Sequence, residues 1–133
     1  MILLDTHVAI WIATNTPALG KKSRALAFAA LAQDQLAVSA ISFWEMALLI
    51  AKGRFKSLDS AAELREQILR GGATELPLTG DIALRAVELG NLPGDPADRF
   101  IVATAIVHGA TLMTADERLL KWRHSLKRLD AEK

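Results

Sequence analysis

Four acidic residues interrupt apolar segments of this chain in a way that suggests shared chemistry. Asp5 and Asp116 each follow a short apolar run, Asp98 opens another such run, and Glu45 lies within a long one. A carboxylate beside buried apolar surface is costly unless another group compensates its charge. Because the pattern recurs at four places, we expect one shared compensator, and a divalent cation fits best.

The electrostatics of such a cluster favour a bound cation. Two unit charges about 4 Å apart interact by roughly 4 kcal/mol at an effective dielectric constant of about 20, so four neighbouring carboxylates would not all stay ionised unaided. Either some of them take up protons or a cation binds. An all-oxygen ligand set selects Mg²⁺ or Mn²⁺ rather than zinc. A water molecule that such a cation retains and acidifies is a nucleophile suited to phosphodiester hydrolysis.

Taken singly, each of the four acids also has a structural explanation. Asp5 and Asp116 could be N-caps of the helices that follow them. Glu45 could complete a capping box that begins at Ser42, and Asp98 could favour the positive end of its helix. Caps need not lie in one region of a fold, however. These four positions fall where the expected topology brings them to one edge, which favours a shared site.

Length and composition indicate an ordinary globular chain. It has 133 residues, 51% of them apolar, and a formal charge of +1, so we expect a single domain over residues 1–133. The net charge gives no bulk electrostatic reason for nucleic-acid binding. Solvated helix surface is the simpler explanation of the basic residues, which gather in two groups. These groups are Lys21, Lys22 and Arg24, and Arg118, Lys121, Arg123, Lys127 and Arg128.

The sequence also bears on cellular location. Cysteine is absent, which excludes disulfides and thiolate metal sites and fits a reducing cytoplasm. Polar residues interrupt the most apolar region, so no stretch is long enough to span a membrane. Met1 leads directly into a strand-like run without the basic leader of a signal peptide. We therefore predict a cytoplasmic protein with no membrane contact.

Hydrophobic patterning and turn residues predict an alternation of strands and helices. Buried strands are predicted over residues 1–4, 36–39, 74–78, 110–113 and 127–129. A helix start is predicted at 5–7, and helices over 21–33, 42–52, 58–70, 81–89, 97–108 and 116–121, with a loop over 91–96. Such an alternation implies an α/β fold with a parallel sheet that helices cover on both faces.

This topology predicts where the acids meet. Ligands of open α/β sheets bind beyond the carboxyl ends of the strands. Asp5 and Asp116 are predicted to follow strands directly, and Glu45 and Asp98 to lie in the first turns of helices. We therefore expect the four carboxylates within about 10 Å of one another at the carboxyl edge of the sheet.

Four segments carry a resemblance to a known family. They are Ile-Leu-Leu-Asp-Thr-His at 2–7, Ser-Ala-Ile-Ser-Phe-Trp-Glu-Met at 39–46, the run from Gly-Asp-Pro-Ala-Asp-Arg-Phe to Thr-Ala at 94–105, and Leu-Met-Thr-Ala-Asp-Glu-Arg-Leu at 112–119. In this order they resemble a PIN-domain ribonuclease, specifically a VapC-type toxin of a toxin–antitoxin pair. The resemblance implies a three-layer sandwich whose central, mainly parallel sheet has four to five strands. It also implies a homodimer and an antitoxin partner that blocks the site.

Carried over by position, the resemblance assigns the acidic site to Asp5, Glu45, Asp98 and Asp116. It favours Asp5 and Asp98 as the closest ligands of Mg²⁺, with Mn²⁺ as a substitute. Asp116 would act through water or complete a second metal site, and Glu45 would bind a water or act as a base. Three further residues are assigned supporting positions, namely Thr6, Asp95 and Thr114.

Those supporting residues have more than one possible role. Thr114 and Thr6 could each donate a hydrogen bond to a carboxylate or to a water. Asp95 could point into the site or hold the shape of the proline-containing loop. Arg99 could pair with Asp95 or contact a phosphate.

These observations predict a metal-dependent endoribonuclease that acts as the toxin of a toxin–antitoxin pair and hydrolyses RNA phosphodiesters with a metal-activated water. One alternative is a receiver-like α/β binding module, but that class requires an acidic pair near the first strand, where this chain has Asp5 alone. A second alternative is a catalytically silent PIN-like protein that only dimerises or binds its antitoxin. Trp11, Trp44 and Phe100 are interpreted as core residues rather than as platforms for bases.

Overall fold

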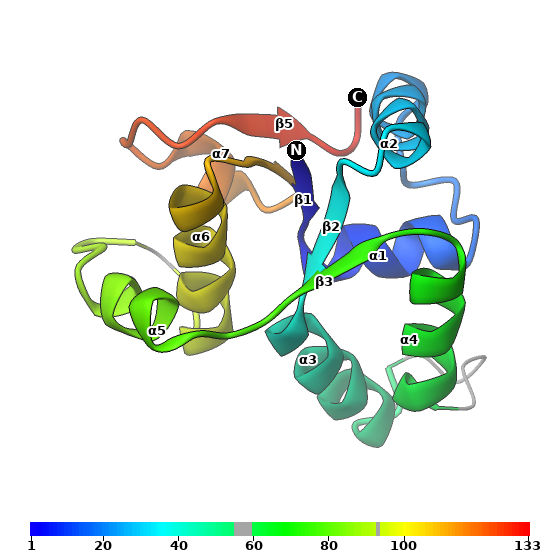
Figure 1. Ribbon diagram of the computed structural model, residues 1–133, viewed down its shortest axis with the longest axis horizontal. Helices are drawn as coiled ribbons and strands as arrows, with labels where there is room; N and C mark the ends of the chain where they lie inside the picture. The colour runs from blue at the N-terminus through cyan, green and yellow to red at the C-terminus, as the bar shows by residue number, and fades with distance from the viewer. Residues whose placement is uncertain (55–59, 93) are drawn as a thin grey trace.

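One parallel sheet forms the centre of the molecule. The computed structural model describes residues 1–54, 60–92 and 94–133, and within them five strands pair in the order β3-β2-β1-β4-β5, all parallel (Figure 1). The strands are β1 (Ile2–Leu4), β2 (Leu36–Ser39), β3 (Thr74–Leu76), β4 (Thr111–Thr114) and β5 (Arg128–Asp130). The predicted α/β sandwich with a parallel sheet is therefore confirmed.

Seven helices are described around this sheet. They are α1 (Thr6–Ala13), α2 (Lys21–Ala32), α3 (Ala40–Ala51), α4 (Ala61–Arg70), α5 (Gly80–Val87), α6 (Pro96–His108) and α7 (Glu117–Lys121). Local sequence explains their ends: α6 has a proline in its first turn and stops at Gly109, whose φ of 62° suits glycine. Within the described ranges, no helix combines the length and apolarity that a membrane crossing requires.

The alternation of side chains along each strand produces two cores. Leu3 of β1 and Leu112 of β4 point into one apolar cluster, which also contains Ile101 of α6. The next residues along the same strands, Leu4 and Met113, point into a second cluster on the opposite face of the sheet. Successive strand residues face opposite sides, so these short strands, buried on both faces, require apolar residues at nearly every position.

The strand order places a crevice at the carboxyl ends of β1 and β4. From β1 the chain adds β2 and then β3 on one side, whereas β4 and β5 pair on the other side of β1. The segments that leave β1 and β4 therefore diverge to different parts of the fold. A reversal of this kind is where open parallel sheets bind ligands. Asp5 and Asp116 are the first acids after these two strands.

One predicted helix start differs from the structure, and another agrees with it. The N-cap of α3 is Ser39, whose hydroxyl accepts a hydrogen bond from the Ile41 backbone N–H, so the prediction that Ser42 caps this helix and Glu45 completes its capping box is wrong. Glu45 consequently lies one turn further into its helix than predicted. The helix predicted over 58–70, with a start near Asp59 or Ser60, is capped by Ser60, in agreement with the second of these starts, while Leu58 and Asp59 lie outside the described residues.

The C-terminal segment packs against the start of α2. The Gly20 N–H donates to the Ala131 carbonyl at 2.8 Å, and the Ser23 hydroxyl donates to the Asp130 carbonyl at 2.7 Å. A Cβ atom at position 20 would lie 2.2 Å from the carbonyl carbon of Lys133. Glycine is therefore required here by close backbone contact, and this contact holds Glu132 beside the crevice.

Gly20→Ala should lower the free energy of unfolding by about 1–3 kcal/mol, because the C-terminal segment must move to admit the methyl group. Gly80→Ala is the matched control, since Gly80 is at the first position of α5 and an added Cβ meets no atom within 4 Å. The control should be neutral or slightly stabilising. Urea denaturation of both variants measures the difference, and equal stabilities would contradict the packing argument.

Candidate active site

Asp5 is fixed where β1 ends and α1 begins. Its Oδ1 accepts a hydrogen bond from the Thr6 backbone N–H at 2.8 Å, and its Oδ2 accepts one from the Thr114 hydroxyl at 2.6 Å. The side chain is buried. Burial raises the pKa of the Asp5 carboxyl above its ordinary value, and the hydrogen bond from Thr114 opposes that effect only in part. Asp5 is thus the N-cap of α1, which is the structural role that the sequence allowed for it. Its second oxygen, however, is held by Thr114 of β4.

Glu45 reaches the same region from α3. The Thr6 hydroxyl donates to Glu45 Oε1 at 2.5 Å and lies 2.9 Å from the buried Ser42 hydroxyl. Burial raises the pKa of Glu45; the Thr6 hydrogen bond lowers it, and the negative charges of Asp5 and Asp95 raise it further. Thr6 therefore links Asp5 to Glu45, its backbone N–H binding one carboxylate and its hydroxyl the other. Ser42, which was predicted to be a helix cap, lies instead beside Thr6, a contact that sequence spacing does not reveal.

Asp95 and Asp98 bind each other's backbone at the start of α6. The Asp98 N–H donates to Asp95 Oδ1 at 3.1 Å, and the Asp95 N–H donates to Asp98 Oδ2 at 3.2 Å, which forms a reciprocal capping box. Gly94 makes this geometry possible, because its φ is 113° and a Cβ there would lie 2.3 Å from Asp98 Oδ2. Burial, followed by the charges of Asp95 and Asp5, raises the pKa of Asp98 to about 7.

Asp116 has the opposite electrostatic environment. Its Oδ1 accepts a hydrogen bond from the Arg118 backbone N–H at 2.9 Å, and its Oδ2 lies 3.0 Å from Nη2 of the Arg118 guanidinium. Burial alone would raise the pKa of Asp116, but the hydrogen bonds and charge of Arg118 outweigh it and hold that pKa below its ordinary value. The ionised form of Asp116 is consequently favoured, and the positive charge of Arg118 offsets its negative charge.

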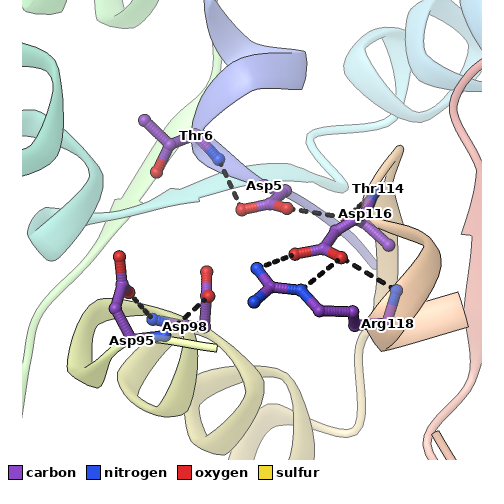
Figure 2. Close-up of polar contacts among 7 residues, drawn as sticks. All are labelled: Asp5, Thr6, Asp95, Asp98, Thr114, Asp116 and Arg118. Atoms are coloured by element: carbon purple, nitrogen blue, oxygen red, sulfur yellow. Dashed lines mark hydrogen bonds and ion pairs between the residues drawn. The ribbon is translucent and has the colours of Figure 1, made fainter. Parts of the chain in front are cut away.

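One cleft brings these groups together. It has a volume of about 370 Å³ and lies at the carboxyl ends of β1 and β4. Figure 2 shows Asp5 and Asp116 on one side and Asp95 and Asp98 on the other, with the Arg118 guanidinium between Asp116 and Asp98. The lining residues are Asp5, Thr6, His7, Trp11, Glu45, Asp95, Asp98, Ala115, Asp116, Arg118 and Glu132.

The cleft contains every acid that the sequence predicted at the edge of the sheet. Thr6 and Asp95 also line it, while Thr114 lies just behind it through its bond to Asp5. Trp11 and Glu132 were not predicted here; Glu132 reaches the cleft only through the packing of the C-terminal segment, which leaves no signal in sequence spacing. Arg99 neither pairs with Asp95 nor enters the cleft, because its guanidinium donates to the Ala86 and Gly90 carbonyls.

The donor set fits a hard divalent cation. One carboxylate oxygen from each of Glu45, Asp95 and Asp98 lies within 4.8 Å of the others. Burial raises the pKa values of Glu45 and Asp98, and the negative charges of neighbouring acids raise them further, so a cation among these acids would stabilise their ionised forms. Oxygen-only ligation suits Mg²⁺ or Mn²⁺. Asp95 can serve both of the roles considered for it, since one of its oxygens caps α6 while its carboxylate belongs to this trio.

Comparison with known proteins agrees with this geometry. Residues 2–124 match the family model described as PIN domain. The chain is 40% identical to Ribonuclease VapC22 of Mycobacterium tuberculosis over 124 residues, which cover 92% of each protein. Among solved structures, it resembles VapBC2 of Rickettsia felis bound to a promoter DNA fragment, with a TM-score of 0.70, 18% identity and 98% coverage of each chain. It also resembles DNA-bound VapBC of Salmonella typhimurium, with a TM-score of 0.67, 22% identity and coverage of 97% and 96%.

The elevated pKa of Asp98 predicts an unusual pH dependence of stability in metal-free protein. Between about pH 4 and pH 7 the folded state keeps a proton that the unfolded state has lost, so this residue makes unfolding easier as the pH rises. The stabilisation produced by Asp98→Asn should therefore grow between pH 5 and pH 8.

Thermal melts in EDTA across this pH range measure that difference against the wild type. Asp81→Asn is the matched control, because Asp81 also lies in the first turn of a helix but is exposed and outside the cleft. A pH trend that Asp81→Asn shares with Asp98→Asn would have a cause outside the cleft. A melting-temperature difference for Asp98→Asn that stays constant with pH would contradict the electrostatic account.

Proposed function

This chain belongs to the PIN-domain family, and we propose that it is a metal-dependent endoribonuclease that acts as the toxin of a toxin–antitoxin pair. The observation that carries the proposal is the single cleft lined by Asp5, Glu45, Asp95, Asp98 and Asp116. The 40% identity of the chain to Ribonuclease VapC22 supports RNA as the substrate. Because its proposed RNA substrate is found in the cytoplasm, we propose that the protein acts there.

We assign Asp98 the central position in metal binding. Burial disfavours the ionised form of its carboxylate, and the charges of Asp95, Asp5 and Glu45 add to that effect, so a cation beside it would offset several unfavourable contributions at once. Asp5 is held by its two hydrogen bonds in one orientation, which suits a second ligand. These residues suit either Mg²⁺ or Mn²⁺, and the bound cation supplies Lewis acidity that neutralises phosphoryl charge and acidifies water.

The remaining residues position the reaction. Thr6 holds Glu45 Oε1, so we assign Glu45 Oε2 as the atom that receives a proton from the attacking water. Thr114 orients Asp5 and also accepts a hydrogen bond from the Asp116 backbone N–H, which ties the two sides of the β1–β4 crevice together. Substitution of such supporting residues typically costs about ten- to a hundredfold in metal affinity or activity.

RNA must be held by groups around the acids rather than by the acids themselves, since carboxylates repel phosphate. The candidates are the basic residues predicted from the sequence, namely Lys21, Lys22, Arg24, Arg118, Lys121 and Arg123. Arg118 lines the cleft directly. Binding through such residues weakens as salt rises, because phosphate contacts release counterions.

A continuous apolar face supports a homodimer. Trp44 on α3 is 54% exposed and therefore is not the core residue that the sequence predicted; Leu78 is 40% and Val87 80% exposed. Two shallow grooves share Pro96 and Phe100 and join this surface across α3, α5 and α6. Contiguous apolar surface marks an interaction site, and we assign it to a second copy of this chain. The resemblance to VapBC structures supports an antitoxin as a separate partner.

The purified chain should cleave RNA internally in the presence of Mg²⁺ or Mn²⁺, and EDTA should stop the reaction. Asp98→Asn should remove activity, and Thr114→Val should lower it by about ten- to a hundredfold because Asp5 loses its orienting bond. Asp81→Asn should match the wild type. A time course on total transfer and ribosomal RNA tests these variants side by side. Equal cleavage by the wild type and Asp98→Asn would indicate a contaminating nuclease and contradict the assigned site.

Light scattering should give twice the chain mass of 14.4 kDa at tens of micromolar. Trp44→Glu should give a monomer, because it places a charge within the apolar face. Phe28→Glu introduces the same charge at an exposed apolar position on α2, outside this face, and should remain dimeric. A monomeric wild type, or a Trp44→Glu variant that stays dimeric, would exclude this interface.

A further inference from the structure

Arg118 is the feature of the cleft that metal binding alone does not explain. Its backbone N–H is part of the cap of α7, yet its side chain turns back over Asp116 (Figure 2). The guanidinium Nε and Nη2 bond the two different oxygens of Asp116, at 3.3 and 3.0 Å. Both carboxylate oxygens of Asp116 are therefore bound by the same guanidinium group.

The guanidinium also interacts with the opposite side of the cleft. The Asp116 hydrogen bond and charge raise the pKa of Arg118, and the negative charges of Asp98 and Asp95 add to that effect. Arg118 thus carries a positive charge within the field of the acids that we assign to a divalent cation. A divalent cation beside Asp98 would repel the guanidinium, because like charges a few ångströms apart interact unfavourably.

The exposure of Arg118 leaves room for its side chain to turn away from Asp116 if a divalent cation binds. Its side chain is 60% exposed, whereas the side chain of Asp116 is only 24% exposed. The next basic residue on α7, Lys121, pairs with Glu117 at 3.7 Å on the exposed surface and does not line the cleft. Arginine suits phosphate particularly well, because its planar group donates two parallel hydrogen bonds.

We propose that Arg118 is an internal counter-ion of the acidic cleft, which a divalent cation displaces from Asp116 and which then binds a phosphate of the RNA. The inference rests on the proposed function, since it assumes both the cation and the RNA. Arg118 weakens cation binding by competing for Asp116, and it positions the substrate once the cation is bound. Substrate binding and cation binding are thereby coupled through one side chain.

Calorimetric titration with Mn²⁺ at low salt tests the competition. Arg118→Gln removes the charge and keeps most of the side chain, so it should bind Mn²⁺ about five- to tenfold more tightly than the wild type, as expected for removing a unit charge several ångströms from a divalent ion. Lys121→Gln removes the same charge from the same helix without contact to the cleft, and should stay within about twofold of the wild type. Melting temperatures confirm that the variants are folded.

RNA binding, measured with Ca²⁺ or with EDTA, tests the second role. In EDTA, Arg118→Gln and Lys121→Gln should weaken binding to a similar small extent, because Arg118 is engaged by Asp116. With Ca²⁺, Arg118→Gln should weaken binding by about tenfold more than Lys121→Gln does. If Arg118→Gln lost the same RNA affinity in Ca²⁺ as in EDTA, the proposal that a divalent cation displaces Arg118 would be overturned.

The outcomes separate this inference from the proposed function. If the wild type binds no Mn²⁺, the proposed function fails and this inference fails with it. If the wild type binds Mn²⁺ and Arg118→Gln binds it with the same affinity, the proposed function stands and the inference is overturned.

Discussion

Mutual repulsion among carboxylates at the carboxyl ends of β1 and β4 is the constraint on which the rest of this site depends. The fold creates it, because parallel strands that diverge from a common edge bring Asp5 and Asp116 together, and α3 and α6 add Glu45, Asp95 and Asp98. Buried charges of one sign are tolerated only when protons, hydrogen bonds or cations offset them. The cleft uses all three: protons are favoured on Asp98, hydrogen bonds hold Asp5, and Arg118 neutralises Asp116.

Three of the acids that line the cleft also cap helices. Asp5, Asp95 and Asp116 are the N-caps of α1, α6 and α7, so three helices begin at the cleft and direct backbone N–H groups toward it. Such groups stabilise negative charge at the start of a helix. The structural and functional explanations that the sequence left open for these acids are therefore compatible. A cap satisfies one oxygen of each carboxylate and leaves the other available for a ligand or a neighbour.

The features that the sequence could predict are those encoded by local patterns. Apolar runs predicted the strands, and acids placed directly after them predicted the edge where Asp5 and Asp116 lie. The failures come from contacts between distant segments. Ser42 was the predicted cap of α3, but β2 ends at Ser39 and the helix begins directly after it, so Ser39 is the cap instead. Trp44 resembles a core residue until the arrangement of α3 shows that it is exposed. The pairing of Arg118 with Asp116 depends on a side chain that folds back, which spacing does not reveal.

The central claim is that the acids at the β1–β4 crevice share a divalent cation, and anomalous diffraction from Mn²⁺-soaked crystals tests it most directly. We predict an anomalous peak inside the cleft, about 2.0–2.3 Å from a carboxylate oxygen of Asp98, with Asp5 or Glu45 also in the coordination sphere of the ion. We also predict that the peak disappears in Asp98→Asn crystals soaked in the same solution. Well-ordered crystals that bind Mn²⁺ elsewhere, with no peak among these carboxylates, would contradict the account.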